Sequence, residues 1–297
     1  MEAAKQEIGS ETGVGQEWIG KELAAVKLPD ARLDKRPRSL MEKMSKGVGR
    51  SIPWACQDWA ATKAAYRFFS NGRVGEEQIL AGHFQATRER AGCVQEPVLV
   101  VHDTTEFSYR RKATAAVGVV SKRLAGKDNH GKPVYFTTRG INLHSSLAIT
   151  QAVEKVQWYA LRWKIEVFHK ILKSGCRAEH VRLRTAPRLI NLLTVFCILS
   201  WRIFWLTMMN RIAPEANRDG VFTNLELRIL DRLVNNNSTV HRGRRKLSHY
   251  LIKLARLGGY LARNGDPPPG NETIWRGLTR LIDIQLGVII GAGFVGN

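Results

Sequence analysis

Cysteines and long apolar runs are scarce in this sequence, and each shortage narrows the class of protein. No C-x-x-C pair occurs, which excludes a zinc ribbon or a disulfide framework and predicts reduced thiols at Cys56, Cys93, Cys176 and Cys197. The first residues include several glutamates and no apolar segment, so no signal peptide is expected. The longest apolar run, Leu189 to Met209, is interrupted by Asn191 and Arg202, which predicts a buried helix. We therefore expect a cytoplasmic protein with no membrane partner.

Acidic residues are also few. The chain of 297 residues has 26 aspartates and glutamates against 46 lysines and arginines, and its formal net charge is +20. A sequence pI of about 10.2 favours a polyanionic partner such as a nucleic acid. The excess reaches +8 over residues 151–212 but only +2 over residues 1–97. The densest positive charge thus surrounds the middle of the chain.

The first third of the sequence predicts a helical domain over residues 15–95, after a disordered tail at 1–14. Its apolar residues recur with helical spacing, and prolines and glycines divide them into short helices with basic links. Such a bundle could lie on DNA, although basic links are also common as merely solvated loops. A further helix is expected from Glu76 to Arg90.

A buried strand, Val98 to Val101, is predicted next, and it leads to Asp103. A carboxylate at the end of a central strand is well placed to hold a cation, because the sheet fixes its direction. The competing interpretation is a turn-forming aspartate. Residues 110–132 read as a hairpin or loop, and strands are expected at 134–137 and 141–149.

The sequence then passes from strand to helix almost without a loop, with Thr150 as the expected N-cap. The last domain, residues 213–297, should be helical and includes an amphipathic helix from Leu247 to Leu261. Its apolar stripe suits packing within the chain or a dimer face. The predicted core therefore spans residues 96–212.

One helix of that core, Trp158 to Lys173, groups polar side chains on one face. At about 100° per residue, Tyr159, Arg162, Glu166 and Lys173 fall on one side, opposite an apolar stripe. The simple interpretation is a solvated surface of i, i+4 ion pairs. The alternative is a phosphate-handling face whose single acid binds a metal, and the positive charge around this helix favours it.

Two stretches together carry a family resemblance. HDTTEFSY around Asp103 and the pattern Y-x-x-R-x-x-x-E-x-x-x-x-x-x-K from Tyr159 to Lys173 resemble bacterial DDE-type insertion-sequence transposases, in the group that includes the Tn-five enzyme. The segments LDKRPRSL, AAYRFF, LHSSLAIT, WKIEVFHKILKSG and LARLGGYLAR are similar to that family as well. The resemblance runs from about Gln16 to Gly291.

The resemblance implies a helical N-terminal domain that binds transposon ends, an RNase H-like catalytic core and a helical C-terminal dimerisation domain. It implies two Mg²⁺ or Mn²⁺ ions held between three carboxylates, with Asp103 as the first and Glu166 as the third. It also implies contacts to the phosphates of double-stranded DNA at transposon inverted-repeat ends. The residues for these contacts would be Tyr159, Arg162 and Lys173, with Lys46 and Arg67 in the N-terminal domain.

The resemblance breaks down at the second carboxylate. Family members carry it on a later strand in an Asp-Arg-Glu-like motif, and here the only acids between Asp103 and Glu166 are Glu106, Asp128 and Glu154. Family members also have a longer segment at this point, with the rest of the sheet and a β-rich insertion. We infer an internal deletion near residues 150–151, which would weaken metal binding and expose an unpaired sheet edge.

Three hypotheses follow for function. The first is a deleted, catalysis-defective transposase that still binds DNA ends and dimerises, either with itself or with a full-length transposase whose activity it would inhibit. The second keeps the enzyme active, with Asp128 or Glu154 replacing the lost acid. The third is a generic basic nucleic-acid-binding protein without sequence preference.

Overall fold

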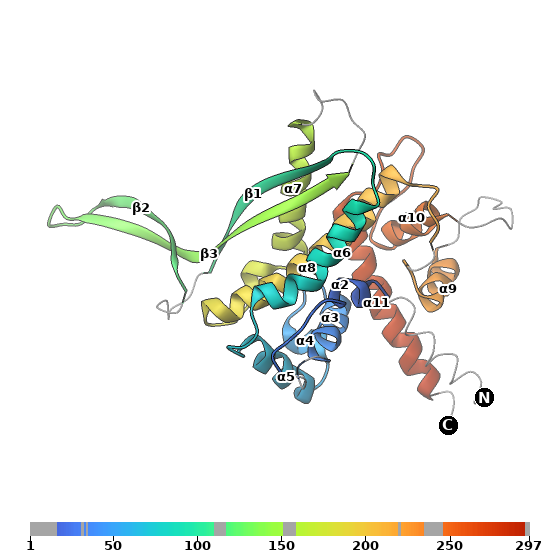
Figure 1. Ribbon diagram of the computed structural model, residues 1–297, viewed down its shortest axis with the longest axis horizontal. Coiled ribbons are helices and arrows are strands. Elements are labelled where there is room, and N and C mark those ends of the chain that lie inside the picture. The colour runs from blue at the N-terminus through green and yellow to red at the C-terminus, as the bar shows by residue number, and fades with distance from the viewer. Residues whose placement is uncertain are drawn as a thin grey trace.

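The long helix α8 (Ala186–Ile212) is the centre of the helical body, and helices from both the N-terminal and the C-terminal parts of the chain pack around it (Figure 1). The computed structural model describes residues 17–30, 33, 35–109, 117–150, 159–218, 221–234 and 246–294. N-terminal helices cover one side of α8, C-terminal helices cover another, and a long β-ribbon projects away from the helices. This mixture of helices with one small antiparallel sheet is an α+β fold, as the sequence predicts. The expected tail at residues 1–14 lies outside the described residues.

Short helices form the N-terminal region, in agreement with the predicted bundle. They are α2 (Glu17–Leu23), α3 (Arg36–Lys46), α4 (Ile52–Cys56), α5 (Trp59–Phe69) and α6 (Glu76–Gly92). Ser51 caps α4 by accepting a hydrogen bond from the backbone N–H of Trp54, and Asp58 caps α5 in the same way through Ala61. These caps satisfy free N–H groups at the helix starts, and the Asp58 cap allows α5 to begin with only two residues between it and the end of α4.

A buried ionic cluster fastens the first of these helices to the last. Glu22 on α2 is only 2% exposed, and it accepts hydrogen bonds from His83 and Arg90 on α6. Burial opposes its ionisation, but the hydrogen bonds and charges of these two partners lower the pKa of Glu22 overall. The guanidinium of Arg90 also lies 4.1 Å from the ring centroid of Trp201 on α8. The cluster thus joins α2, α6 and α8.

The sheet consists of β1 (Val98–Ser108), β2 (Val119–Lys127) and β3 (Pro133–Thr150), in the order β1-β3-β2. The second half of β3 pairs with β1, and its first half pairs with β2. The described ribbon is therefore about two strands wide along its whole length. The two strands predicted at 134–137 and 141–149 are one continuous strand, because no residue between them interrupts the pairing. β2 lies in the predicted hairpin or loop region.

The prediction of a buried, central strand at Val98 to Val101 is wrong. β1 lies at an edge of the sheet and is two-faced: Val98 and Val100 are exposed, whereas Leu99 and Val101 pack against the core. Asp103 is in the middle of this strand and not at its end. A run of valines does not distinguish a strand buried on both faces from one that alternates.

The C-terminal part contains α9 (Asn224–Leu233), α10 (Leu247–Leu257) and α11 (Asn271–Phe294). The last domain is helical as predicted, but α10 ends at Leu257, before the predicted end at Leu261. The three helices pack on one another, and α10 and α11 also pack on α8. α8 is long and apolar enough to cross a membrane, but 72% of its most apolar window is buried inside the protein. It is the core helix that the interrupted apolar run predicts.

Candidate functional site

The helix that carries the transposase-like signature has three different pitches along its length. It begins as a 3₁₀ turn, η4 (Tyr159–Arg162), continues as α7 (Trp163–Lys170) and ends as a π-turn, η5 (Ile171–Gly175). Ile165 and Leu172 are fully buried, as the apolar stripe predicts. π-turns inside helices are frequent at functional sites, because they change the direction of the side chains that follow.

The change of pitch divides the expected polar face. Arg162 and Glu166 lie 3.9 Å apart and both are more than half exposed, so their ion pair contributes roughly 0–1 kcal/mol. Lys173 points toward the inner face of β1, with its Nζ 5.6 Å from the ring centroid of Phe107. The backbone of Tyr159 belongs to η4, but its side chain lies outside what the structure describes.

Asp103 reaches this helix from the sheet. Its inward direction follows from the alternation of β1, since Phe107, four residues later, is on the same face and fully buried. The side chains of Asp103, Glu166 and His169 each offer a ligand atom, and these atoms lie within 4.8 Å of one another. Within the described parts of the chain, this is the one group of three or more such residues. The two carboxylates named from the sequence are thus brought together.

His169 is the member that sequence reasoning missed. It is 4% exposed, its Nδ1 lies 3.7 Å from Oδ2 of Asp103, and its Nε2 lies 2.7 Å from Oγ of Ser145 on β3. Burial lowers the pKa of His169, as does the charge of Lys173, while the charges of Asp103 and Glu166 oppose this. Its spacing was an available signal, because a histidine three residues after a glutamate lies on the same helical face.

The order Ser145–His169–Asp103 also resembles the relay of a serine hydrolase. In such a relay the acid accepts a hydrogen bond from Nδ1 of the histidine. The 3.7 Å separation here is longer than a hydrogen bond, and Glu166 adds a second carboxylate that a relay does not use. The arrangement therefore fits cation binding better than acyl transfer.

The other acids of this region do not join the cluster. Glu106 is on the opposite face of β1 from Asp103, since the two are an odd number of positions apart along the strand. Asp128 holds the turn between β2 and β3 by accepting hydrogen bonds from the N–H groups of His130 and Lys132. This turn precedes the start of β3, and Ser145, which pairs with Asp103, lies some twelve residues further along that strand. At 3.3 Å per residue the separation is roughly 40 Å. Glu154 lies outside the described residues.

This donor set fits a three-carboxylate, two-magnesium centre poorly. Mg²⁺ prefers an octahedron of oxygens, and two metals bridged between acids need three carboxylates to balance their charge. Two carboxylates and one imidazole would balance one divalent ion. Among the described residues no third acid is within reach.

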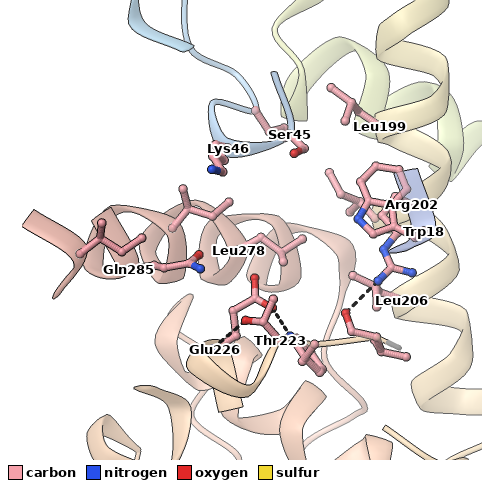
Figure 2. Close-up of a pocket in the computed structure, with 16 residues that line it drawn as sticks. Trp18, Ser45, Lys46, Leu199, Arg202, Leu206, Thr223, Glu226, Leu278 and Gln285 are labelled. Atoms are coloured by element: carbon pink, nitrogen blue, oxygen red, sulfur yellow. Dashed lines mark hydrogen bonds between the residues drawn. The ribbon is translucent and has the colours of Figure 1, made fainter. Parts of the chain in front are cut away.

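The two N-terminal candidates have different surroundings. Lys46, at the end of α3, faces a pocket of about 110 Å³ between α8, α9 and α11, where its charge helps to lower the pKa of Glu226 (Figure 2). Burial outweighs that effect and raises the pKa of Glu226 overall, and burial lowers the pKa of nearby Arg202 to about 10. Arg67 on α5 is exposed. In this conformation Arg67 is open to solvent, whereas Lys46 lies against the C-terminal helices.

A basic groove lies beside α5. Its volume is about 620 Å³, and it runs between the start of α4 and the turn that precedes α8. Three exposed arginines line it, namely Arg50, Arg177 and Arg182, together with His180 and Tyr66. Arginines that converge with an aromatic side chain on one groove suit the phosphates and bases of a nucleic acid. The spacing of these residues along the sequence does not predict that this turn lies beside the N-terminal helices.

Comparison with known families identifies both ends of the chain. Residues 15–74 match the family described as Transposase DNA-binding. With its basic groove and helical N-terminal region, the chain is a DNA-binding protein of the transposase class. Residues 198–292 match the Transposase Tn5 dimerisation domain. The two matches together span more than half of the chain, which belongs to the Tn5-type transposases. A search of curated proteins gave no match.

Proposed function

We propose that this protein is an internally deleted Tn5-type transposase that binds transposon ends as a dimer and does not cleave them. The observation that carries the proposal is the incomplete acid set: Asp103 and Glu166 meet, and no further carboxylate of the described chain joins them. Cleavage by this class of chemistry needs one ion to activate water and another to stabilise the leaving oxygen. With two acids in place of three, the second ion is left without sufficient negative charge.

The shape of the sheet supports a deletion near residues 150–151. An RNase H-like core requires further strands beside β1, and in the described chain β1 pairs with β3 alone. A cavity of about 440 Å³ also lies between β3, α6 and α8, with Trp201, Trp205 and Phe204 in its wall. A cavity of this size with a mainly apolar lining suits a further segment of chain, which the proposed deletion would have removed. The predicted seam itself, Thr150 to Gln151, borders residues 151–158, which are outside the described chain.

DNA binding would use the N-terminal helices and the basic groove, with Arg67 on the same helix as Tyr66 at the rim of that groove. The partner would be double-stranded DNA at transposon inverted repeats. The dimer would form either between two copies or with a full-length transposase, and in the second case the protein would inhibit transposition in the cytoplasm. We expect these two partners, transposon-end DNA and a second transposase chain, because the proposed protein keeps the end-binding and dimerisation regions and lacks only the complete catalytic centre.

Two measurements on the purified full chain test this function. The first is binding to duplexes that carry the inverted repeats flanking the gene, compared with scrambled duplexes of the same length and composition. The second is strand cleavage of the same duplexes with Mg²⁺ or Mn²⁺. We expect preferential binding without cleavage. Robust cleavage would overturn the proposal, and equal affinity for both duplexes would indicate a generic basic DNA-binding protein instead.

A paired substitution gives the control. Arg67→Ala should weaken end binding, because it removes an exposed cation beside the groove, whereas Arg88→Ala, also exposed but on α6, should leave it unchanged. Adding the protein to an active full-length relative should lower its transposition frequency. Undiminished transposition at equal expression would contradict the inhibitory role alone.

A further inference from the structure

The outer half of the β-ribbon, residues 119–139, extends away from the helical body and is called the outer ribbon below (Figure 1). Every residue from 122 to 137 is exposed, on both faces of the two paired strands. Three of these residues are large and apolar: Leu124 is 64% exposed, Tyr135 48% and Phe136 63%. Large apolar side chains gathered in the open on one element mark a surface that contacts a partner.

The outer ribbon is also basic. Five of its residues carry positive charge, namely Lys122, Arg123, Lys127, Lys132 and Arg139. Asp128 is the one acid of residues 119–139, and its carboxylate holds the turn by accepting hydrogen bonds from the N–H groups of His130 and Lys132. This charge favours a polyanionic partner over the same ribbon of a second copy, because two ribbons of like charge repel each other.

Each face of the outer ribbon places a cation beside an aromatic ring. Lys122 and Tyr135 share one face, and Nζ of the lysine lies 4.7 Å from the ring centroid of the tyrosine. Arg123 and Phe136 pair directly in the β2–β3 ladder, so they share the other face. Basic residues interleaved with aromatic ones are typical of surfaces that bind nucleic acids.

We propose that the outer ribbon is a second DNA-contacting surface, which lies in the major groove of duplex DNA and contacts it without sequence preference. The major groove is about 12 Å wide and admits a two-stranded ribbon. Cations on both faces of the ribbon can then reach the phosphates of both DNA strands. Lysines bind phosphates as point charges, and phosphate contacts carry no sequence information.

The inference rests on the proposed function for its class of partner, but it concerns a surface apart from the N-terminal helices and the basic groove. The two surfaces would have different tasks. The N-terminal helices would recognise the transposon end, whereas the outer ribbon would add affinity for any duplex. Loss of an end-specific contact weakens binding to the end sequence alone, and loss of a phosphate contact weakens binding to all sequences about equally.

The test measures fluorescence anisotropy of the full chain with a labelled end duplex and with a scrambled duplex, over a series of salt concentrations. The ribbon variant combines Lys122→Gln, Arg123→Gln and Lys127→Gln, three exposed positions of β2. Its affinity should fall by the same factor on both duplexes. If each cation contacts one phosphate, the slope of log affinity against log salt concentration should become shallower by about 2.7 on each duplex.

A matched control variant removes the same charge from exposed positions elsewhere, through glutamine at Arg88, Arg263 and Arg276. Its slopes should stay close to those of the unmodified chain, because charges far from the DNA are screened by salt. Arg67→Ala, in contrast to the ribbon variant, should lower the affinity for the end duplex much more than that for the scrambled duplex.

A second measurement needs no substitution. The unmodified protein is acetylated with an N-hydroxysuccinimide ester, with and without the scrambled duplex, and the modified lysines are located by mass spectrometry. Lys122, Lys127 and Lys132 should lose most of their reactivity when the duplex is present. Lys246, an exposed lysine directly before α10, should keep its reactivity.

The proposal is overturned if the ribbon variant and the control variant have equal slopes, or if the ribbon lysines stay reactive on DNA. It is also overturned if the ribbon variant sediments differently from the unmodified chain while its DNA affinity is unchanged, since the ribbon would then contact a second copy. Equal binding of both duplexes by the unmodified chain would contradict end recognition instead. A shallower slope of the ribbon variant would support the outer ribbon in that case as well.

Discussion

The basic groove gives the prediction with the clearest magnitude. If Arg50, Arg177 and Arg182 each contact one phosphate, replacing all three by glutamine removes three contacts that release counterions. Each contact contributes about 0.9 to the slope of log affinity against log salt concentration, so the slope should become shallower by about 2.7. Over a roughly fourfold rise in salt concentration, the affinity of the unmodified chain should therefore fall about 40-fold further than that of the variant.

The assay is fluorescence anisotropy of a labelled end duplex at a series of salt concentrations. The control variant loses the same net charge elsewhere, through glutamine at Arg88, Arg263 and Arg276, all of which are exposed. Its slope should stay close to that of the unmodified chain, because long-range charge is screened within about 10 Å at 0.1 M salt. Equal slopes for the groove variant and the control variant would refute the assignment of this groove to DNA.

Three further predictions concern stability and reactivity. Glu22→Gln should lower the free energy of unfolding by about 2–3 kcal/mol in urea titrations, somewhat below the usual cost of breaking a buried ion pair because one partner is partly exposed. The folded state lowers the pKa of Glu22 below its ordinary value of 4.5. The contribution of Glu22 to stability is therefore complete above pH 4.5 and is lost as the pH falls through the lowered pKa. Gly277→Ala should destabilise the protein by about 1–3 kcal/mol in thermal unfolding, because the added Cβ would lie 2.0 Å from a backbone oxygen of α10. In thiol labelling at mildly alkaline pH, exposed Cys93 should react first, while burial raises the pKa of Cys176 to about 12 and should keep it unreactive until unfolding.

Each of these predictions has its own check. Gly287→Ala lies on the same helix, α11, with open space around its Cβ position, so it should be neutral or stabilise by up to about 1 kcal/mol. Equal effects of the two glycine variants would contradict the close packing of α10 on α11. A pH-independent effect of Glu22→Gln between pH 3 and pH 7 would contradict the ionic contribution. Labelling of Cys176 as fast as Cys93 would show that α8 and η5 open readily.

Local patterns were sufficient for most helices. The predicted helices at 76–90 and 189–209 correspond to α6 and α8, because helical periodicity and caps depend on residues within a few positions of one another. Patterns also located the strands at 98–101, 134–137 and 141–149, but they did not predict where β1 lies in the sheet. Whether a valine-rich strand is central or at an edge depends on partners elsewhere in the chain, which a local pattern does not contain.

The sequence by itself determined the class of protein and the two acids that meet, since Asp103 and Glu166 lie in motifs specific enough to be identified from the order of the residues alone. Only the tertiary structure decided what surrounds them. His169 and Ser145 join Asp103 from a helix and a second strand, through contacts that sequence spacing does not encode. The π-turn directs Lys173 at β1, and chain packing turns Lys46 toward the C-terminal helices. The physical reason is that a motif specifies side-chain types along one element, whereas a site is made where several elements converge.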